Sequence, residues 1–264
     1  MSQGKQFLFK LLLCGDGAVG KTSIREQYMG KGFAGSYMKT IGADFASHKT
    51  EIAGNKVTYQ IFDLAGQDAY TVARKSFYKG GQAAFLIFDL QDPSSLHNLS
   101  TWIKDCIDNS GGTISTFVVL GNKADLVETR QVSNQMAIEY CQRIAAESGL
   151  TFVFLETSAK SGMNVGLAFD LMGKRLLEKH NIDVTVDLPE GTEMITPGDF
   201  NESGNSVEVA QATAVAEASS MKVEGLSDDL TGINSRLDNI DERLDSLEKR
   251  FGKLAQLMKK VMEK

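Results

Sequence analysis

The sequence predicts a doubly wound α/β domain with a six-stranded, mostly parallel sheet, followed by a C-terminal α-helical coiled coil. Three observations support this fold class. Short apolar runs alternate with segments of helical periodicity over residues 1–180, which is typical of a parallel sheet covered by helices. A glycine-rich turn joins the first apolar run to the first helical segment. Near the C-terminus, apolar residues follow a heptad spacing.

The first apolar run, residues 8–14, is interrupted only by Lys10 and predicts a buried strand. It leads into residues 15–22, which fit the phosphate-binding loop pattern G-x-x-x-x-G-K-[ST], and residues 21–29 then predict a helix. Successive N–H groups in such a loop form a concave anion site at the positive end of the helix. This strand–loop–helix context favours nucleotide phosphate binding over an incidental glycine-rich turn.

Two side chains of this loop carry the expected chemistry. Lys21 would reach the β- and γ-phosphates, and the Thr22 hydroxyl would hold Mg²⁺. The glycines matter because the backbone must curl tightly around phosphate, where a Cβ would obstruct it. We therefore expect the phosphates to contact Gly15, Asp16, Gly17, Ala18, Val19, Gly20, Lys21, Thr22 and Ser23.

A later loop predicts that the base is guanine. The apolar run 117–120 leads into an N-K-x-D sequence formed by Asn122, Lys123 and Asp125. The Asp125 carboxylate would accept hydrogen bonds from guanine N1–H and the exocyclic amine, a donor pair that adenine lacks on that edge. Asn122 would brace the loop and the ring, and the Lys123 stem would lie along the base face. The alternative is an ordinary polar turn, which the upstream phosphate loop disfavours.

A third loop follows the apolar run 151–155. Here the Ala159 N–H is expected to face guanine O6, while Ser158 and Lys160 shape the loop. The sequence E-T-S-A-K is weak evidence in isolation. As the third element in the correct order it is strong, so the sequence predicts that GTP and GDP are the ligands.

In this order the motifs resemble the Ras-like small GTPases, and within them most closely the Rab branch. The resemblance extends from residue 7 to about residue 180. Residues 41–45 and 77–81 look like Rab signatures. The resemblance rests on the phosphate loop, Thr40 within residues 37–45, the D-L-A-G-Q sequence at 63–67, the N-K-A-D sequence at 122–125 and the S-A-K sequence at 158–160.

The resemblance implies further roles in nucleotide binding. Phe33 would pack against the guanine edge, and Tyr37 would also contact the nucleotide. Asp63 would hold Mg²⁺ through water, beside direct ligands from Thr22 and Thr40.

For hydrolysis, the resemblance makes Gln67 the residue that orients the attacking water. Lys21 and Thr40 are the other expected catalytic residues, with Thr40 closing on Mg²⁺ and the γ-phosphate. The Gly66 N–H would sense the γ-phosphate. The pattern departs from Rab proteins at Phe62 and Leu64, where Trp and Thr are usual. We expect these changes to alter partner recognition and not the chemistry.

The family also implies partners. The protein should hydrolyse GTP slowly alone and depend on an activating protein, an exchange factor and effectors that read residues 33–45 and 65–78. Arg74 is interpreted as a surface or partner contact, and no other arginine near the switches suggests a contribution to catalysis in cis. A nucleotide-locked coiled-coil scaffold is the competing hypothesis, disfavoured by the intact catalytic set. A translation-type GTPase is disfavoured by the Rab-like switches.

Composition limits other functions. The net charge of −6 and the lack of a basic, aromatic-rich stripe argue against nucleic-acid binding. The three cysteines show no metal spacing and suit buried thiols in a reducing cytoplasm. No apolar run reaches the length of about 18 residues that a spanning helix needs. No cysteine follows Cys141, and Ser2 replaces the glycine of a myristoylation signal, so we expect no lipid anchor.

Beyond the expected GTPase domain (1–180), residues 181–225 carry nine acids against one lysine and predict a flexible linker. Residues 226–264 predict a coiled coil for self-association or partner binding, with an amphipathic helix docked on the GTPase domain as the alternative. Charges favour a parallel pairing, and Leu at a admits trimers or tetramers. The basic stretch 249–264 could alternatively bind an anionic membrane surface. The heptad positions are Leu226, Leu230, Ile233, Leu237, Ile240, Leu244, Leu247, Phe251, Leu254, Met258 and Val261.

Within the domain, Ala53, Gly54 and Asn55 predict a hairpin, and hence one antiparallel edge pair in an otherwise parallel sheet. We expect the nucleotide at the carboxyl ends of the strands. The expected strands are 8–14, 44–52, 56–63, 83–89, 116–121 and 152–156, and the expected helices are 21–29, 69–78, 94–109, 133–148 and 164–180.

Overall fold

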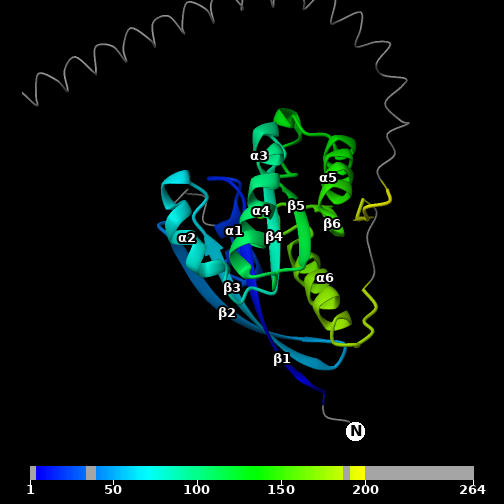
Figure 1. The fold of residues 1–264 in the computed structure, drawn as a ribbon. Coiled ribbons are helices and arrows are strands. Elements are labelled where there is room, and N and C mark those ends of the chain that lie inside the picture. The colour runs from blue at the N-terminus through cyan, green and yellow to red at the C-terminus, as the bar shows by residue number, and fades with distance from the viewer. Residues whose placement is uncertain (1–3, 34–39, 187–190, 200–264) are drawn as a thin grey trace, which may run out of the picture. The chain divides into compact units, whose positions relative to one another are not determined.

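The computed structural model describes residues 4–33, 40–186 and 191–199, apart from the side chains of residues 68, 71 and 73. Tyr37, the later part of the predicted linker and the whole predicted coiled coil lie outside the described residues. The described chain forms one mixed sheet with helices on both faces, as the ribbon shows (Figure 1). None of its helices has both the length and the hydropathy needed to cross a bilayer.

Seven strands form the sheet in the order β2-β3-β1-β4-β5-β6-β7. The pairs β3-β1, β1-β4, β4-β5 and β5-β6 are parallel, so these five strands end at the same edge. This edge is where the loops of the predicted site begin. The strands are β1 (Gln6–Cys14), β2 (Ala43–Ile52), β3 (Asn55–Leu64), β4 (Ala83–Asp89), β5 (Thr116–Asn122), β6 (Phe152–Glu156) and β7 (Glu193–Ile195).

The predicted hairpin between β2 and β3 is confirmed. Ile52 pairs with Asn55, and the two turn residues Ala53 and Gly54 have φ angles of 47° and 72°. Positive φ at both central positions is typical of the turn whose twist matches a right-handed hairpin. The hairpin places Thr40, just before β2, opposite the end of β3.

The helices agree with the expected positions except in one place. The expected helix 94–109 is two helices that meet at Asn98. The hydroxyls of Tyr140 and Ser100 both donate to the His97 carbonyl, which competes with a continuous helical hydrogen-bond ladder. The helices are α1 (Lys21–Tyr28), α2 (Thr71–Tyr78), α3 (Pro93–His97), α4 (Leu99–Ser110), α5 (Asn134–Ser148) and α6 (Val165–Glu178), with single 3₁₀ turns at Asp68–Tyr70 and Val127–Thr129.

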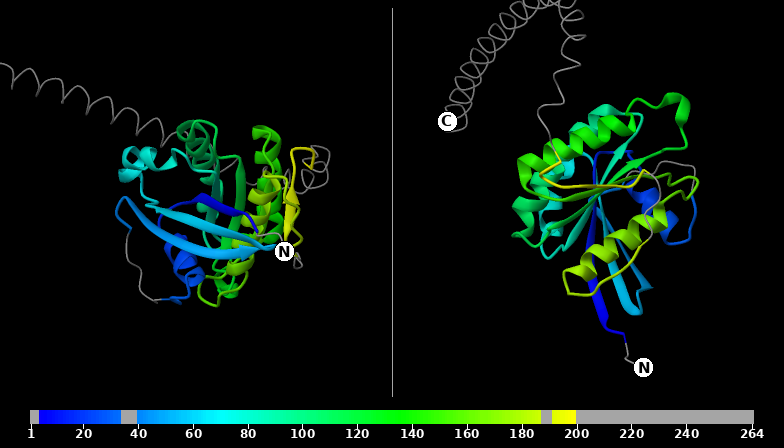
Figure 2. Two further views of the ribbon diagram at one scale, coloured as in Figure 1. Left: turned by 90° about the horizontal axis from the view of Figure 1, so that it is seen from below. Right: turned by 90° about the vertical axis from the view of Figure 1, so that its right-hand side faces the viewer.

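Two hydrophobic cores lie on the two faces of the sheet, because successive strand side chains point to opposite faces. Leu11 and Leu13 of β1 join the core shared with α1 and α6. Leu12 and Cys14 join the core shared with α2, α3, α4 and α5. Figure 2 shows this sandwich from two further sides. Because helices cover both faces of the sheet, the polar loops of the site lie at its carboxyl edge.

The expectation of six strands was wrong, because β7 forms a second antiparallel edge beside β6. This strand lies in residues 181–225, the range predicted as a flexible linker. Ile195 pairs with Phe152 and is buried, and Val184 is buried as well. The prediction used the average composition of residues 181–225, which is acidic. It did not account for Val184 and Ile195, whose apolar side chains are both buried in the core.

We expect Ile195→Ala to lower the free energy of unfolding by about 2 kcal/mol or more, because it removes a buried side chain from the sheet edge. Met194 is the matched control, since its side chain is 51% exposed on the same strand. Met194→Ala should change stability by less than about 0.5 kcal/mol. Guanidinium unfolding of the full chain measures both, and equal losses would contradict the described packing of β7.

Candidate functional site

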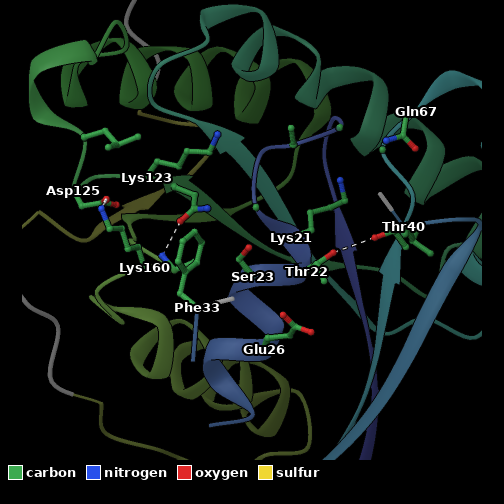
Figure 3. A pocket seen from close by; sticks show the side chains of 18 residues that line it. Lys21, Thr22, Ser23, Glu26, Phe33, Thr40, Gln67, Lys123, Asp125 and Lys160 are labelled. Carbon is green, nitrogen blue, oxygen red and sulfur yellow. Dashed lines mark hydrogen bonds and ion pairs between the residues drawn. The ribbon is translucent and has the colours of Figure 1, made fainter. Parts of the chain in front are cut away.

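Four turns meet at the carboxyl edge of the sheet and line a cavity of about 510 Å³. They follow β1, β3, β5 and β6, and Thr40 joins them from the segment before β2. In Figure 3, Phe33, Lys123, Asp125 and Lys160 lie at one end of the cavity, and Thr40 and Gln67 lie at the other. Lys21 and Thr22 lie between the two groups.

Most of the predicted site residues line this cavity, although their binding roles stay predictions. Gly15, Asp16, Val19, Asp63 and Ser158 do not line it, and Tyr37 is not described. Glu26, Leu64 and Leu126 line it without having been predicted. The predicted residues that line it are Gly17, Ala18, Gly20, Lys21, Thr22, Ser23, Phe33, Thr40, Gly66, Gln67, Asn122, Lys123, Asp125, Ala159 and Lys160.

The glycines of the phosphate loop are required by close contacts. A Cβ on Gly15 would lie 2.1 Å from the Ile87 carbonyl oxygen, and one on Gly20 would lie 2.3 Å from Nδ2 of Asn122. Both residues have positive φ angles, of 140° and 100°. The loop therefore keeps a tight curve that a side chain at either position would break. This cradle fits a phosphate group.

Lys21 lies buried inside this curve. Its Nζ donates to the carbonyl oxygens of Gly15 and Asp16, both at 2.6 Å. Burial lowers the pKa of Lys21 to about 8, although the negative charge of Asp63 opposes this shift. A buried ammonium group is stabilised by a nearby anion, so the loop is electrostatically prepared for phosphate.

Three oxygen-bearing side chains converge beside Lys21. The Thr22 hydroxyl donates to Oδ2 of Asp63 at 2.5 Å and lies 3.1 Å from the Thr40 hydroxyl. Burial raises the pKa of Asp63, while the Thr22 hydrogen bond and the Lys21 charge oppose the rise. Oδ1 of Asp63 is buried, and among the described residues no group donates to it. Clustered hard oxygens with an unsatisfied carboxylate fit Mg²⁺.

Asn122 links three of the turns. Its Nδ2 donates to the Val19 carbonyl at 2.8 Å, which braces the phosphate loop. Its Oδ1 accepts from the Thr157 hydroxyl at 3.3 Å and from the Ala159 N–H at 3.1 Å. In this structure the Ala159 N–H is thus engaged by Asn122. Its expected contact with guanine O6 stays a prediction.

The Asp125 carboxylate is oriented by the neighbouring loop. The Ser158 hydroxyl donates to its Oδ1 at 2.6 Å, and Lys160 Nζ lies 3.9 Å from its Oδ2. Lys123 has a positive φ of 69° and reaches across to Asp89, with 2.6 Å between Nζ and Oδ2. The Lys123 stem therefore runs along the cavity from its backbone in the turn after β5 to its ion pair with Asp89. Phe33 is about half exposed at the same end.

The interpretation of Arg74 as a surface or partner contact was wrong. Its side chain is buried, and Nη1 donates to the carbonyl oxygens of Ala65 and Gln67. The guanidinium also stacks on Trp102, so its charge and its planar face are both used inside the fold. No local sequence pattern indicates this contact, because α2 and α4 are distant in sequence.

Comparison with known proteins identifies the family of this chain. The pattern of the Ras family matches residues 10–178. The chain belongs to the Ras family. Similar Ras-family proteins include Ras-related protein Rab7 of Drosophila melanogaster, 38% identical over 205 residues that cover 76% of this chain and 95% of that protein. Ras-related protein Rab-9A of Rattus norvegicus is 40% identical over 177 residues, 66% of this chain and 85% of the relative.

Ras-related protein Rab-13 of Bos taurus is 35% identical over 179 residues, which cover 68% of this chain and 85% of the relative. These comparisons confirm the predicted resemblance to Rab-type members of the Ras family. As a Ras-family protein, this chain is a GTPase that binds GTP and GDP with Mg²⁺ and hydrolyses GTP to GDP.

In this Ras-family protein we expect Asn122→Ala to weaken GDP binding at least tenfold and to lower the free energy of unfolding by about 2–3 kcal/mol. The change leaves the Val19 carbonyl and the Ala159 N–H without their partner. Nucleotide titration and thermal unfolding measure the two effects.

Thr157→Val is the matched control for this variant. It removes only the 3.3 Å bond to Oδ1 of Asn122 and should cost less than about 1 kcal/mol. If both variants lost the same affinity, the brace from Asn122 to the phosphate loop would not be the important contact.

Proposed function

We propose that this protein is a Rab-like molecular switch that alternates between GTP-bound and GDP-bound forms and hydrolyses GTP slowly on its own. The proposal rests on one observation: a single cavity has Asp125 at one end and Thr40 and Gln67 at the other, with Lys21 and Thr22 between them. This spacing suits a guanine base at Asp125 and a terminal phosphate beside Gln67. A role in vesicle-trafficking-type or signalling regulation follows from the Rab resemblance.

Each residue would have a defined task in hydrolysis. Thr22 and Thr40 would hold Mg²⁺ directly and Asp63 through water. When bound, Mg²⁺ would neutralise charge on the β- and γ-phosphate oxygens. Lys21 would stabilise the same charge from inside the phosphate loop. Gln67 would orient the attacking water in line with the bond that breaks.

The position of Gln67 supports its proposed task. A Cβ built on Gly17 would lie 3.3 Å from Nε2 of Gln67, so the amide is next to the phosphate loop. Gly66 is packed more closely still, since a Cβ there would lie 2.4 Å from the Gly17 nitrogen. After hydrolysis, Thr40 and Gly66 would lose their contacts with the γ-phosphate, and the two segments around them would relax.

Effectors would read this change on a neighbouring aromatic cluster. The ring centroids of Phe45 and Phe62 are 5.1 Å apart, and those of Phe62 and Phe77 are 6.2 Å apart. Lys10 covers Phe62, with Nζ 4.4 Å from the ring centroid. Phe45 is about half exposed and follows Thr40 closely in sequence. Ordering of Thr40 would thus be transmitted to an apolar surface that a protein partner can bind.

The C-terminal region would control assembly or location. We infer a parallel coiled coil over 226–264, on the strength of its heptad pattern, for self-association or for binding a partner helix. The acidic residues between the last described residue and this coiled coil would form a flexible linker. We propose action in the cytoplasm and at a membrane surface, through this partner or through the basic stretch 249–264.

Gly17→Val and Gln67→Leu test the hydrolytic function. We expect each to slow single-turnover hydrolysis at least tenfold, because the first displaces the Gln67 amide and the second removes it. GTP dissociation should change less than about threefold. Gly17→Val keeps the backbone N–H of the phosphate loop, and Gln67 is expected to orient the attacking water and not to bind the nucleotide. Phosphate release from the GTP-loaded full chain is the measurement.

Gly166→Val provides the matched glycine control, because a Cβ at this position in α6 meets no atom within 4 Å. It should hydrolyse GTP like the wild type. Absent turnover in the wild-type chain, even with an activating protein present, would instead favour a nucleotide-locked scaffold.

A further inference from the structure

A single arginine holds the turn that carries Gly66 and Gln67. Nη1 of Arg74 donates to the Ala65 carbonyl at 2.9 Å and to the Gln67 carbonyl at 2.8 Å. These two carbonyls flank Gly66, and the Arg74 side chain is only 4% exposed. Hydrogen bonds from a buried cation to neutral acceptors are stronger than neutral ones. The turn is therefore fixed from the protein side, independently of the nucleotide.

This contact sets the direction of the Gly66 N–H. The Ala65–Gly66 peptide is trans, so the Ala65 carbonyl and the Gly66 N–H point in opposite directions. Because the carbonyl faces Arg74, the N–H faces away from it. The phosphate loop lies against Gly66, since a Cβ on this residue would approach the carbonyl carbon of Asp16 to 2.3 Å. Arg74 thus orients the N–H that the proposed function assigns to the γ-phosphate.

Arg74 is itself held by one face of α4. The centre of its guanidinium lies 4.3 Å from the Trp102 ring centroid, a cation–π distance. Its Nη2 lies 3.8 Å from Oδ2 of Asp105. Trp102 and Asp105 are three residues apart and share a helix face.

The platform on α4 is anchored to the phosphate loop by Asp16. Nε1 of Trp102 donates to Oδ1 of Asp16 at 2.8 Å, and Nδ2 of Asn98 donates to Oδ2 at 2.7 Å. This explains why the Asp16 side chain does not line the cavity. The contacts therefore form a closed series. Asp16 of the phosphate loop accepts from Trp102, Trp102 stacks on Arg74, and Arg74 holds the turn that contains Gly66. Gly66 in turn packs on the phosphate loop.

We propose that Arg74 is a positioning residue for GTP recognition and hydrolysis, which holds the Ala65-Gly66-Gln67 turn against the phosphate loop through the platform of Trp102 and Asp105. Arg74 acts through Gly66 and Gln67, because Nη1 bonds to protein carbonyls. The inference rests on the proposed function of those two residues. Its distinctive consequence is discrimination between GTP and GDP, since only GTP has the phosphate that the Gly66 N–H would bind.

Arg74→Met in the full chain tests the proposal, because methionine retains an apolar stem and removes every donor. We expect single-turnover GTP hydrolysis to fall about tenfold and GTP dissociation to accelerate about tenfold. GDP dissociation should change less than about twofold, because GDP lacks the group that the oriented N–H contacts. Arg74→Lys keeps a donor and the charge, and should recover part of both losses.

Arg143→Met is the matched control. Arg143 also stacks on an aromatic ring, Tyr140 at 5.1 Å, but it belongs to α5 and does not line the cavity. This variant should leave all three rates unchanged. If Arg74→Met changed GTP and GDP dissociation equally, or left hydrolysis unchanged, the positioning role would be overturned.

Trp102→Phe provides an independent arm in case Arg74→Met does not fold. Phenylalanine keeps a ring under Arg74 but cannot donate to Asp16. It should raise the ratio of GTP to GDP dissociation rates about threefold, and an unchanged ratio would overturn the proposal. A wild-type chain without GTP turnover would contradict the proposed function itself. Normal wild-type turnover with a normal Arg74→Met rate would contradict only this inference.

Discussion

The buried ammonium group of Lys21, enclosed by a backbone curve that has no room for a Cβ, is the constraint on which the site depends. The carbonyl of Ile87 and the amide of Asn122 occupy the space that side chains at Gly15 and Gly20 would need. A cation in this setting loses hydration and is stabilised by an anion that replaces the lost water. The loop therefore favours phosphate before any base contact is made.

The topology of the sheet places further turns beside this loop. Parallel strands bring the turns after β1, β3, β5 and β6 to the same edge. Asn122 connects the phosphate loop to the turns after β5 and β6, and Arg74 holds the turn after β3. In the proposed function, recognition of the base and of the terminal phosphate would both depend on contacts with the same central loop.

The sequence predicted those parts of the structure that local patterns determine. The phosphate loop, the N-K-A-D turn and the β2–β3 hairpin each have short signatures, and their positions agreed with the structure. The break at Asn98, strand β7 and the burial of Arg74 depend on residues distant in sequence, such as Tyr140, Phe152 and Trp102. Propensity and composition contain no information about such partners. The bond from Ala159 to Asn122 was missed for the same reason.

Displacement of a fluorescent GDP analogue from the full chain in the presence of Mg²⁺ measures the selectivity of the site for guanine nucleotides. We expect GTP and GDP to displace it at concentrations roughly a thousandfold or more below ATP, because adenine lacks the donor pair that Asp125 is proposed to bind. Displacement by ATP at the same concentration as GTP would contradict the proposed guanine site. So would a chain that retains no nucleotide at micromolar concentration.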